Sequence, residues 1–306
     1  MAHKTIQLSA LPNRRLSSLI APREHGAWGL LFVPLVTGGA VGLFAGGNGL
    51  PLAELAIAVL ALFWLRTPAE SWLGTGLLFA QSRQERRSVG ITILILATIA
   101  ASSLAILFRD GRNRDLLLLG GIGVLAFIAQ ALLRKLSRRT RMLSQIVGTL
   151  GLTVTAPAAY YVVTGQLDRN AGALWVANFL FAGNQIHFVQ LRIHSARVSG
   201  WRQKFACGRT FLVGQMLMAA ALVFAWRFHL LPGLAALAFL PLLVRGMAWF
   251  FEGQKPLAVR RLGWTELAYA MIFGIVLIAG FHLQPFRSSR SPSIVSSQFI
   301  SKSGTR

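Results

Sequence analysis

Acidic residues are scarce in this chain, and charged residues of either sign are few. The 306 residues include 9 Asp and Glu against 31 Lys and Arg, and charged residues make up 13% of the composition. A soluble domain carries roughly 25% charged residues, whereas the mean hydropathy here is +0.58. These values exclude an ordinary soluble domain and indicate a membrane protein with several spans.

Cysteine is nearly absent. Cys207 is the single cysteine, which excludes an intrachain disulfide and a cluster of thiolates around one metal ion. The N-terminal stretch is basic and polar as far as Pro22, and it lacks the apolar core and small-residue cleavage site of a signal peptide. We therefore expect no cleaved leader.

Apolar stretches recur along the chain, each close to the ~20 residues that a helix needs to cross a bilayer. We predict an all-α polytopic membrane helix bundle with nine transmembrane helices. The predicted spans are residues 23–45, 52–72, 88–108, 116–134, 143–164, 172–191, 210–227, 230–250 and 264–283.

Polar segments flank this transmembrane domain of residues 23–284. Residues 1–22 form a basic N-terminal arm, and residues 285–306 form a Ser/Arg-rich tail of low complexity. A tail of this composition cannot bury enough apolar surface to fold, so we expect it to be disordered.

Lys and Arg are concentrated in alternate loops, on the side of the N-terminal arm. Because basic loops stay in the cytoplasm, we predict a multi-pass protein of the bacterial cytoplasmic (inner) membrane. Its N-terminus would be cytoplasmic and, with nine spans, its C-terminus outside. The same pattern accounts for the net charge of +22 without nucleic acid as a partner, and membrane lipids are the expected partners.

Small residues and prolines predict how the helices pack. Gly38, Gly42 and Gly46 recur every four residues, and Gly148 and Gly151 repeat the pattern in the fifth span. Such strips let neighbouring helices approach closely. In addition, Pro157 and Pro241 lie inside predicted spans and predict kinks.

The sixth predicted span is unusually polar. Four of its side chains fall within one stripe when successive residues are placed 100° apart: Asn184, His187, Gln190 and His194. Gln185 and Arg192 lie near the opposite side. Polar side chains inside a membrane usually face the bundle interior. Two turns separate the histidines, about 10 Å, so we predict no shared metal ion.

Ionisable residues also mark the start of the first span. Arg23, Glu24 and His25 follow Pro22, which suits the first position of a helix. They either start and cap this helix or form a corner that binds an anion near its free N–H groups.

The second span carries a capping-box pattern close to its inner end. Thr67 is followed by Pro68 and, at the third position, by Glu70. Thr-x-x-Glu with Pro after Thr is typical of a helix start, so we predict that one helix stops near Arg66 and another begins at Pro68. Arg66 would then lie beside a helix N-terminus, where phosphate or carboxylate binds well.

Three more polar residues lie at the same predicted depth. Gln145 begins the fifth span, and Glu266 is predicted to lie in the first turn of the last span. Arg245, within the eighth span, is a candidate partner for a buried acid.

Two resemblances follow from these residues. Arg23-Glu24-His25-Gly26-Ala27-Trp28, followed by Pro34, resembles the opening motif of the YwiC-like family of bacterial membrane proteins. Leu262-Gly263-Trp264-Thr265-Glu266 is similar to that family's second landmark. More distantly, residues 139–165 resemble the fifth helix of the UbiA superfamily of intramembrane prenyltransferases, which also have nine helices.

The UbiA resemblance implies two Asp-rich motifs that hold Mg²⁺ for a prenyl diphosphate. The corresponding stretches here are residues 63–72, with Glu70 as their one acid, and residues 183–197, with none. Magnesium prefers hard oxygen ligands such as carboxylates. The sequence therefore resembles UbiA proteins in architecture but not in this metal site.

These observations predict a basic, cytoplasm-facing polar cavity that binds an anionic amphipathic ligand, such as an isoprenoid or lipid phosphate. Arg side chains would bind the anion directly, and no cofactor is predicted. The predicted binding residues are Arg23, Glu24, His25, Arg66, Glu70, Asn184, His187, Gln190, Arg192, His194 and Glu266.

Two other functions stay open at this point, so the sequence does not decide whether the protein is an enzyme. The first is a divergent UbiA-type prenyltransferase or lipid transferase, which would require Mg²⁺ or use the histidines as acid/base groups. The second is a transporter or permease, which would favour inverted repeats.

Overall fold

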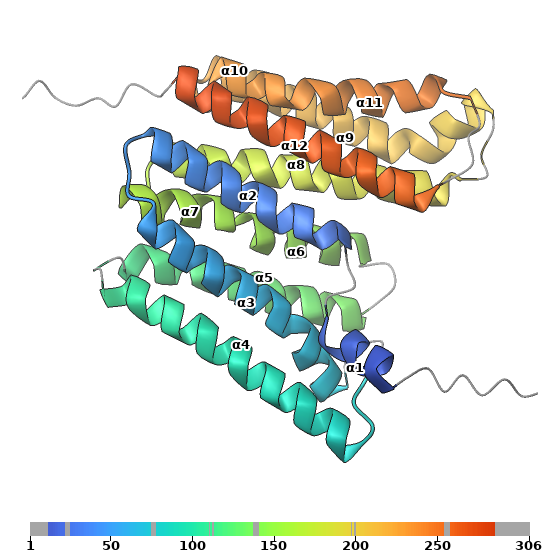
Figure 1. Cartoon of the computed structure of the whole chain (residues 1–306). Coiled ribbons are helices and arrows are strands. Elements are labelled where there is room, and N and C mark those ends of the chain that lie inside the picture. Colours follow the sequence, from blue (N-terminus) through green and yellow to red (C-terminus); the bar gives the residue numbers. More distant parts are fainter. Residues whose placement is uncertain are drawn as a thin grey trace, which may run out of the picture.

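The computed structural model describes residues 12–21, 25–74, 78–109, 111, 113–136, 141–196, 198, 200–253 and 258–284. In these residues the protein is all-helical, without a strand (Figure 1). The helices are α1 (Pro12–Ile20), α2 (His25–Phe44), α3 (Leu50–Leu73), α4 (Arg83–Arg109), α5 (Asn113–Leu136), α6 (Arg141–Thr153), α7 (Thr155–Thr164), α8 (Arg169–His194), α9 (Trp201–Arg227), α10 (Gly233–Ala236), a 3₁₀ turn (Leu237–Phe239), α11 (Leu240–Phe251) and α12 (Val259–Leu283).

Seven helical segments of the described chain are long and apolar enough to cross a membrane. They are Leu50–Leu73, Arg83–Arg109, Arg114–Arg134, Met142–Thr164, Trp201–Arg227, Gly233–Phe251 and Arg260–Leu283. The protein is therefore a multi-pass membrane protein. The apolar part of α2, Trp28–Phe44, is shorter. Since α2 and the polar α8 run alongside the seven (Figure 1), a total of nine spans stays a prediction.

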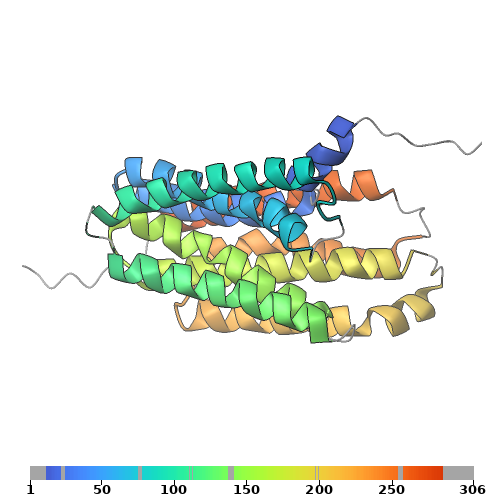
Figure 2. The ribbon, with the colours of Figure 1, turned by 90° about the horizontal axis from the view of Figure 1, so that it is seen from below.

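The long helices lie roughly parallel to one another, as the view from below also shows (Figure 2). α3 pairs with α4, and α5 pairs with α6, whereas α10 and α12 pack together on the other side. Between these groups, α2 contacts α7 and α12, and α8 contacts α6, α7 and α9. α2 begins at the end of the bundle where α1 lies, and α12 finishes at the opposite end (Figure 1). We call these the α1 end and the far end.

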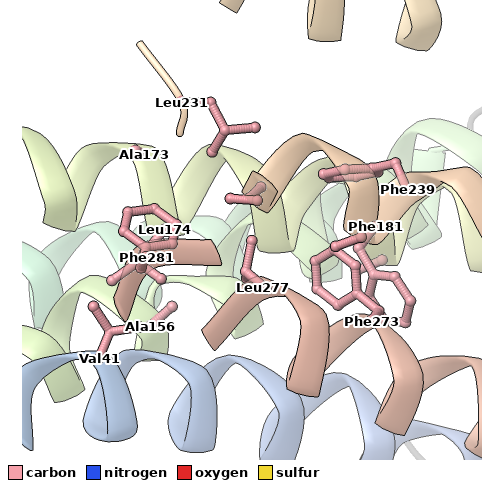
Figure 3. Close-up of a cluster of buried hydrophobic side chains, with 14 of the residues drawn as sticks. Val41, Ala156, Ala173, Leu174, Phe181, Leu231, Phe239, Phe273, Leu277 and Phe281 are labelled. Carbon is pink, nitrogen blue, oxygen red and sulfur yellow. The ribbon is translucent and has the colours of Figure 1, made fainter. Parts of the chain in front are cut away.

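The described residues form four buried apolar clusters, of which two are large. The larger joins α2, α7, α8 and the helices from α9 to α12, and in it Phe181 of α8 stacks on Phe273 of α12 with ring centroids 4.1 Å apart (Figure 3). The smaller joins α3, α4, α5 and α7 through residues such as Leu107 and Val162. In lipid, close packing rather than exclusion of water holds such helices together.

The predicted glycine strip is confirmed at two of its three positions. A Cβ on Gly38 would lie 2.0 Å from the carbonyl oxygen of Ala156 in α7, and one on Gly42 would lie 2.9 Å from Val163. Gly46 instead follows α2 in a turn with φ +85°, a backbone conformation that glycine adopts without strain. α2 and α7 therefore form a close seam along the first two glycines.

The second pair of small residues brings α6 onto α5, as predicted. A Cβ on Gly148 would lie 2.4 Å from the side-chain nitrogen Nε2 of Gln130, and one on Gly151 would lie 2.8 Å from the Cβ of Ala126. Both partners belong to α5. The α5–α6 pair is thus set by the absence of side chains at these two positions.

Both predicted proline kinks are confirmed as interruptions. Near Pro157 the helix breaks at Val154, between α6 and α7. Pro241 is the second residue of α11, which begins at Leu240 directly after the 3₁₀ turn. In each case proline lacks the N–H that would continue the preceding helix.

The predicted break at Pro68 is wrong. α3 runs without interruption from Leu50 to Leu73 with Pro68 buried inside it. It ends at Gly74, whose backbone is left-handed and whose N–H donates to the carbonyl of Glu70. One proline removes a single backbone donor, and the packing of α3 outweighs the local preference of the capping-box residues for a helix start.

Candidate functional site

Three predicted binding residues, Arg23, Glu24 and His25, are consecutive in the sequence. Arg23 and Glu24 lie outside the described residues, and for His25 the structure describes the backbone alone. The nearest described side chain is Trp28, whose ring lies 4.8 Å from that of Phe63 in α3. The start of α2 is therefore packed on α3 at the α1 end.

Arg66 and Glu70 bind each other within α3. The Arg66 Nε donates to Glu70 at 2.9 Å, and the two side chains are 18% and 34% exposed. The guanidinium also lies 5.8 Å from the ring centre of Phe127 in α5. Glu70 therefore pairs with Arg66 one turn away, where the sequence predicted a cap, and this pair faces the α5 side of the bundle.

A second ion pair joins α11 to α12 and is much more buried. The Arg245 Nη1 donates to both carboxylate oxygens of Glu266 at 2.6 Å, with side chains 8% and 12% exposed. The Arg245 guanidinium lies 4.1 Å from the ring centre of Phe188 and 4.5 Å from that of Tyr269. The prediction that Arg245 partners a buried acid is confirmed.

The predicted place of Glu266 in a first turn is wrong. α12 begins at Val259, two turns earlier, because Arg260 and Arg261 continue the helix rather than precede it. Glu266 consequently meets a guanidinium instead of free N–H groups at a helix start. The ion pair, and not the helix dipole, compensates its charge.

α8 is enclosed by protein on more than one face. Gln185, predicted on the side opposite the polar stripe, is buried and donates to the backbone carbonyl of Glu266 at 2.9 Å. About two turns earlier, Asn178 exchanges hydrogen bonds with Thr37 of α2 at 3.0 and 3.3 Å. Sequence reasoning missed Gln185 because it looked for one polar face. Amides on opposite faces of one helix in a membrane protein indicate that neighbouring helices pack against both faces.

The predicted stripe contacts two different neighbours. His187 meets the edge of Phe211 in α9, with ring centroids 5.2 Å apart, whereas Gln190 donates to Gln145 in α6. His194 is exposed, and its Nδ1 lies 2.8 Å from the carbonyl of Gln190. Gln145 was predicted to lie at the same depth as the stripe, and its contact with Gln190 agrees with that. A cavity along the stripe stays a prediction.

Basic residues tie α8 and α9 to the end of α11. Arg192 lies 3.5 Å from the carboxylate of Glu252. The buried Lys204 donates to the backbone carbonyls of Trp249 and Glu252 at 3.1 and 2.5 Å. The last backbone carbonyls of a helix have no hydrogen-bond donor within the helix, so a cationic side chain that donates to them satisfies them. This part of the α1 end is therefore held together by charge.

In the described chain, most buried polar atoms without a partner belong to three side chains, one each from α8, α9 and α11. Among the described residues, six buried side-chain nitrogen or oxygen atoms have no hydrogen-bond partner. Five of them belong to Asn184, Gln215 and Arg245, and the sixth is an oxygen of Glu54. Since buried polar groups are nearly always satisfied, this region is the best candidate for a binding site. Sequence reasoning missed Gln215, which has no charge and no motif around it.

No three His, Cys, Asp or Glu side chains of the described chain are grouped so that they could hold a metal ion. The described polar clusters instead consist of guanidinium, ammonium and amide groups, with Glu266 and Glu252 each bound to a basic side chain.

Comparison with protein families gives one match. The YwiC-like protein family matches residues 21–160. The chain is therefore YwiC-like over these residues. The match begins with the Arg23–Trp28 motif and extends from α2 into α7, so the predicted recognition is confirmed there. A search among curated proteins found no match.

The YwiC-like region contains the Arg66–Glu70 ion pair but not the buried one between α11 and α12. Arg66 and Glu70 lie inside it, whereas Arg245 and Glu266 lie beyond its end, on helices that the match does not reach. The likeness of Leu262–Glu266 to a second YwiC landmark stays a prediction, as does the distant UbiA likeness.

Proposed function

We propose that this YwiC-like membrane protein binds an anionic amphipathic molecule of the isoprenoid-phosphate or lipid-phosphate type, with Arg245 holding the anionic head. The supporting observation is that Arg245 uses one terminal nitrogen for Glu266 while its Nε and Nη2, both buried, have no partner in the described chain. An arginine in a transmembrane helix is costly unless its donors are used.

The chemistry of guanidinium explains the choice of ligand. It stays charged and offers a planar fork of N–H donors that matches phosphate or carboxylate oxygens. With one edge bound to Glu266, the remaining donors of Arg245 can bind two more oxygens. Direct binding by arginine would make a metal ion unnecessary at the head group.

The other groups of this region suit an amphipathic molecule. Arg192 and Lys204 add positive charge near the α1 end, and the rings of Phe188 and Tyr269 cover Arg245 with apolar surface. A head group at Arg245 would extend its tail among lipid-facing helices. The part that Arg23, Glu24, His25 and Arg66 play in binding stays a prediction from the sequence.

Lipid analysis of the purified protein tests this proposal. Native mass spectrometry of the wild type should show a co-purified anionic lipid, and the double variant Arg245→Met/Glu266→Leu should lose it. This variant removes both charges together, so that no charge is left buried alone. The matched control is Arg66→Met/Glu70→Leu, which should retain the lipid. Equal retention by all three proteins, or a wild type without anionic lipid, contradicts the proposal.

We further propose that the α1 end faces the cytoplasm and the far end faces outside, because most basic residues lie at the α1 end. Gln81, between α3 and α4, and Gln166, between α7 and α8, are exposed at opposite ends. The test uses a Cys207→Ser background and a membrane-impermeant maleimide. The reagent should label Gln166→Cys in intact cells, whereas it should label Gln81→Cys only after the cells are permeabilised. The reverse pattern would invert the orientation.

A further inference from the structure

Gln215 is the most unusual buried side chain near Arg245. It lies in the middle of α9, is 3% exposed, and neither its amide nitrogen nor its oxygen has a partner among the described residues. An amide buried without hydrogen bonds is unfavourable, and still more so where lipid surrounds the helices. Two unsatisfied atoms on one side chain indicate that a molecule not belonging to the chain completes them.

Gln215 lies directly against α11. A Cβ on Gly246, the residue after Arg245, would lie 2.5 Å from the Gln215 nitrogen. One turn before Gln215, the ring of Phe211 contacts that of Phe188, with centroids 5.7 Å apart. Arg245 covers the same Phe188 ring. Gln215 and Arg245 therefore flank one pair of aromatic rings.

The third side chain with an unpartnered atom is Asn184 of α8. It is one turn before Phe188 and is buried, and its amide oxygen has no partner in the described part of the chain. Residues four apart lie on one face of a helix, so Asn184 and Phe188 face the same way. The three side chains with unpartnered atoms thus come from α8, α9 and α11, and Asn184 lies on the α8 face that carries Phe188.

The unpartnered atoms are of two chemical kinds. Arg245 offers N–H donors, which bind anionic oxygens, and the Gln215 nitrogen adds another donor. The side-chain amide oxygens of Asn184 and Gln215 are acceptors, and only a hydrogen-bond donor can satisfy an acceptor. A fully esterified or ionised phosphate has no donor to offer them, whereas a hydroxyl group does.

We infer that the Asn184 and Gln215 side-chain oxygens each accept a hydrogen bond from a hydroxyl group of the ligand, so that the ligand is an anionic lipid whose head carries at least two hydroxyls, as in a glycerol phosphate or sugar phosphate. This inference rests on the proposed function, because Arg245 binds the phosphate of the same head. Arg245 supplies affinity for the anion, and the two amides select the hydroxylated head.

Two lipids of equal charge test the selection. Phosphatidylglycerol and phosphatidylmethanol are both phosphodiesters with one negative charge, and the first alone carries head-group hydroxyls. Binding of each to the full chain in detergent is measured by native mass spectrometry. Leaving one buried acceptor unsatisfied reduces affinity about tenfold, so the wild type should prefer phosphatidylglycerol by about tenfold or more.

Variants assign the preference to the amides. Asn184→Leu should reduce the preference for phosphatidylglycerol and leave phosphatidylmethanol binding unchanged. Gln215→Met also removes an N–H donor, so it should weaken phosphatidylglycerol binding more than phosphatidylmethanol binding. Gln203→Met, an exposed amide on the same helix as Gln215, should retain the preference. If one amide variant does not fold, the other variant and the wild-type comparison still decide.

The two proposals fail in different ways. Equal binding of both lipids by the wild type, as expected if water alone occupies the amides, overturns the hydroxyl inference and leaves anion binding by Arg245 intact. Undiminished binding of both lipids by Arg245→Met/Glu266→Leu overturns the proposed function itself.

Discussion

Two of the arginine–carboxylate pairs toward the α1 end of this protein lie on opposite sides of the bundle. Arg66 and Glu70 are one turn apart on α3 and partly exposed, whereas Arg245 and Glu266 join two helices and are almost fully buried. The first pair needs no tertiary structure, because residues four apart on a helix already meet. The second exists only when α11 and α12 pack together.

The difference matters because burial changes what a charge costs. A partly exposed pair is screened by water and contributes little. A buried pair has lost its hydration, so each charge depends on its partner, and any unused donor remains unsatisfied. This is why the unpartnered nitrogens of Arg245 carry the functional proposal and Arg66 does not.

The largest expected effect comes from breaking the buried pair. Glu266→Gln keeps the shape of the side chain but leaves the charge of Arg245 without compensation, so the free energy of unfolding should fall by about 3–5 kcal/mol. Thermal unfolding of the detergent-purified protein measures this. Arg245→Met/Glu266→Leu serves as the control and should recover most of the loss. A Glu266→Gln protein as stable as the wild type would show that the pair is solvated.

Next in size is the seam that holds the two sides together. Gly38→Ala places a methyl group 2.0 Å from the Ala156 carbonyl oxygen, so α2 must move away from α7, at a cost of about 1–3 kcal/mol. Gly172→Ala in α8, where nothing lies within 4 Å of the added carbon, is the matched control and should not destabilise. The melting temperature of Gly38→Ala should therefore be lower than that of Gly172→Ala. Equal melting temperatures would show that α2 and α7 do not pack as closely as the structure has them.

A smaller effect is expected from the polar contact between α8 and α2. Asn178→Leu removes the hydrogen bonds with Thr37, and interhelical hydrogen bonds in membranes contribute about 0.6 kcal/mol on average, up to about 1.7. Thr37 keeps its bond to the Pro34 carbonyl, which limits the loss. Thermal unfolding of this variant is compared with that of the double variant Thr37→Val/Asn178→Leu. The comparison separates the contribution of the Thr37–Asn178 hydrogen bonds from other effects of replacing Asn178. A loss as large as that of Glu266→Gln would contradict the ranking.

The smallest effect is expected from the pair within α3. Glu70→Gln should lower stability by at most about 0.5 kcal/mol, the size of a single pair four residues apart on a helix. The decrease should diminish further as salt is added, because exposed charges are screened. Unfolding curves at low and high ionic strength measure both. A loss comparable to that of Glu266→Gln would remove the contrast between the two sides.

Part of the candidate site could be predicted from residue type alone: Asn184 was a predicted binding residue, and Arg245 was predicted as the partner of a buried acid but not as a binding residue. Arg245 was recognised because a charge inside an apolar span needs a partner, and Gly38 because glycine repeated every four residues allows close approach. Gln215 and Gln185 could not be recognised, since an amide in a helix gives no sign of whether its atoms find partners. That depends on which backbone or side chain of another helix lies opposite.

Local motifs were the least reliable guide. Thr67-Pro68-Ala69-Glu70 has the residues of a helix start, yet α3 continues through it. A cap contributes about 1 kcal/mol, whereas ending the helix there would leave several backbone groups unsatisfied in the membrane, each costing several kcal/mol. The cost of the unsatisfied backbone groups exceeds the gain from the cap, and that cost depends on the whole span.

The sequence by itself determined that this is a helical membrane protein of several spans, basic toward one end and tightly packed along its glycines. Those properties follow from the lengths of apolar runs, the places of Lys and Arg, and the absence of side chains at given positions. Only the tertiary structure decided that Arg245 pairs with Glu266, and that Asn184 and Gln215 remain unpartnered beside them. The reason is that a buried hydrogen bond is set by the few ångströms between two helices, which no pattern along one helix encodes.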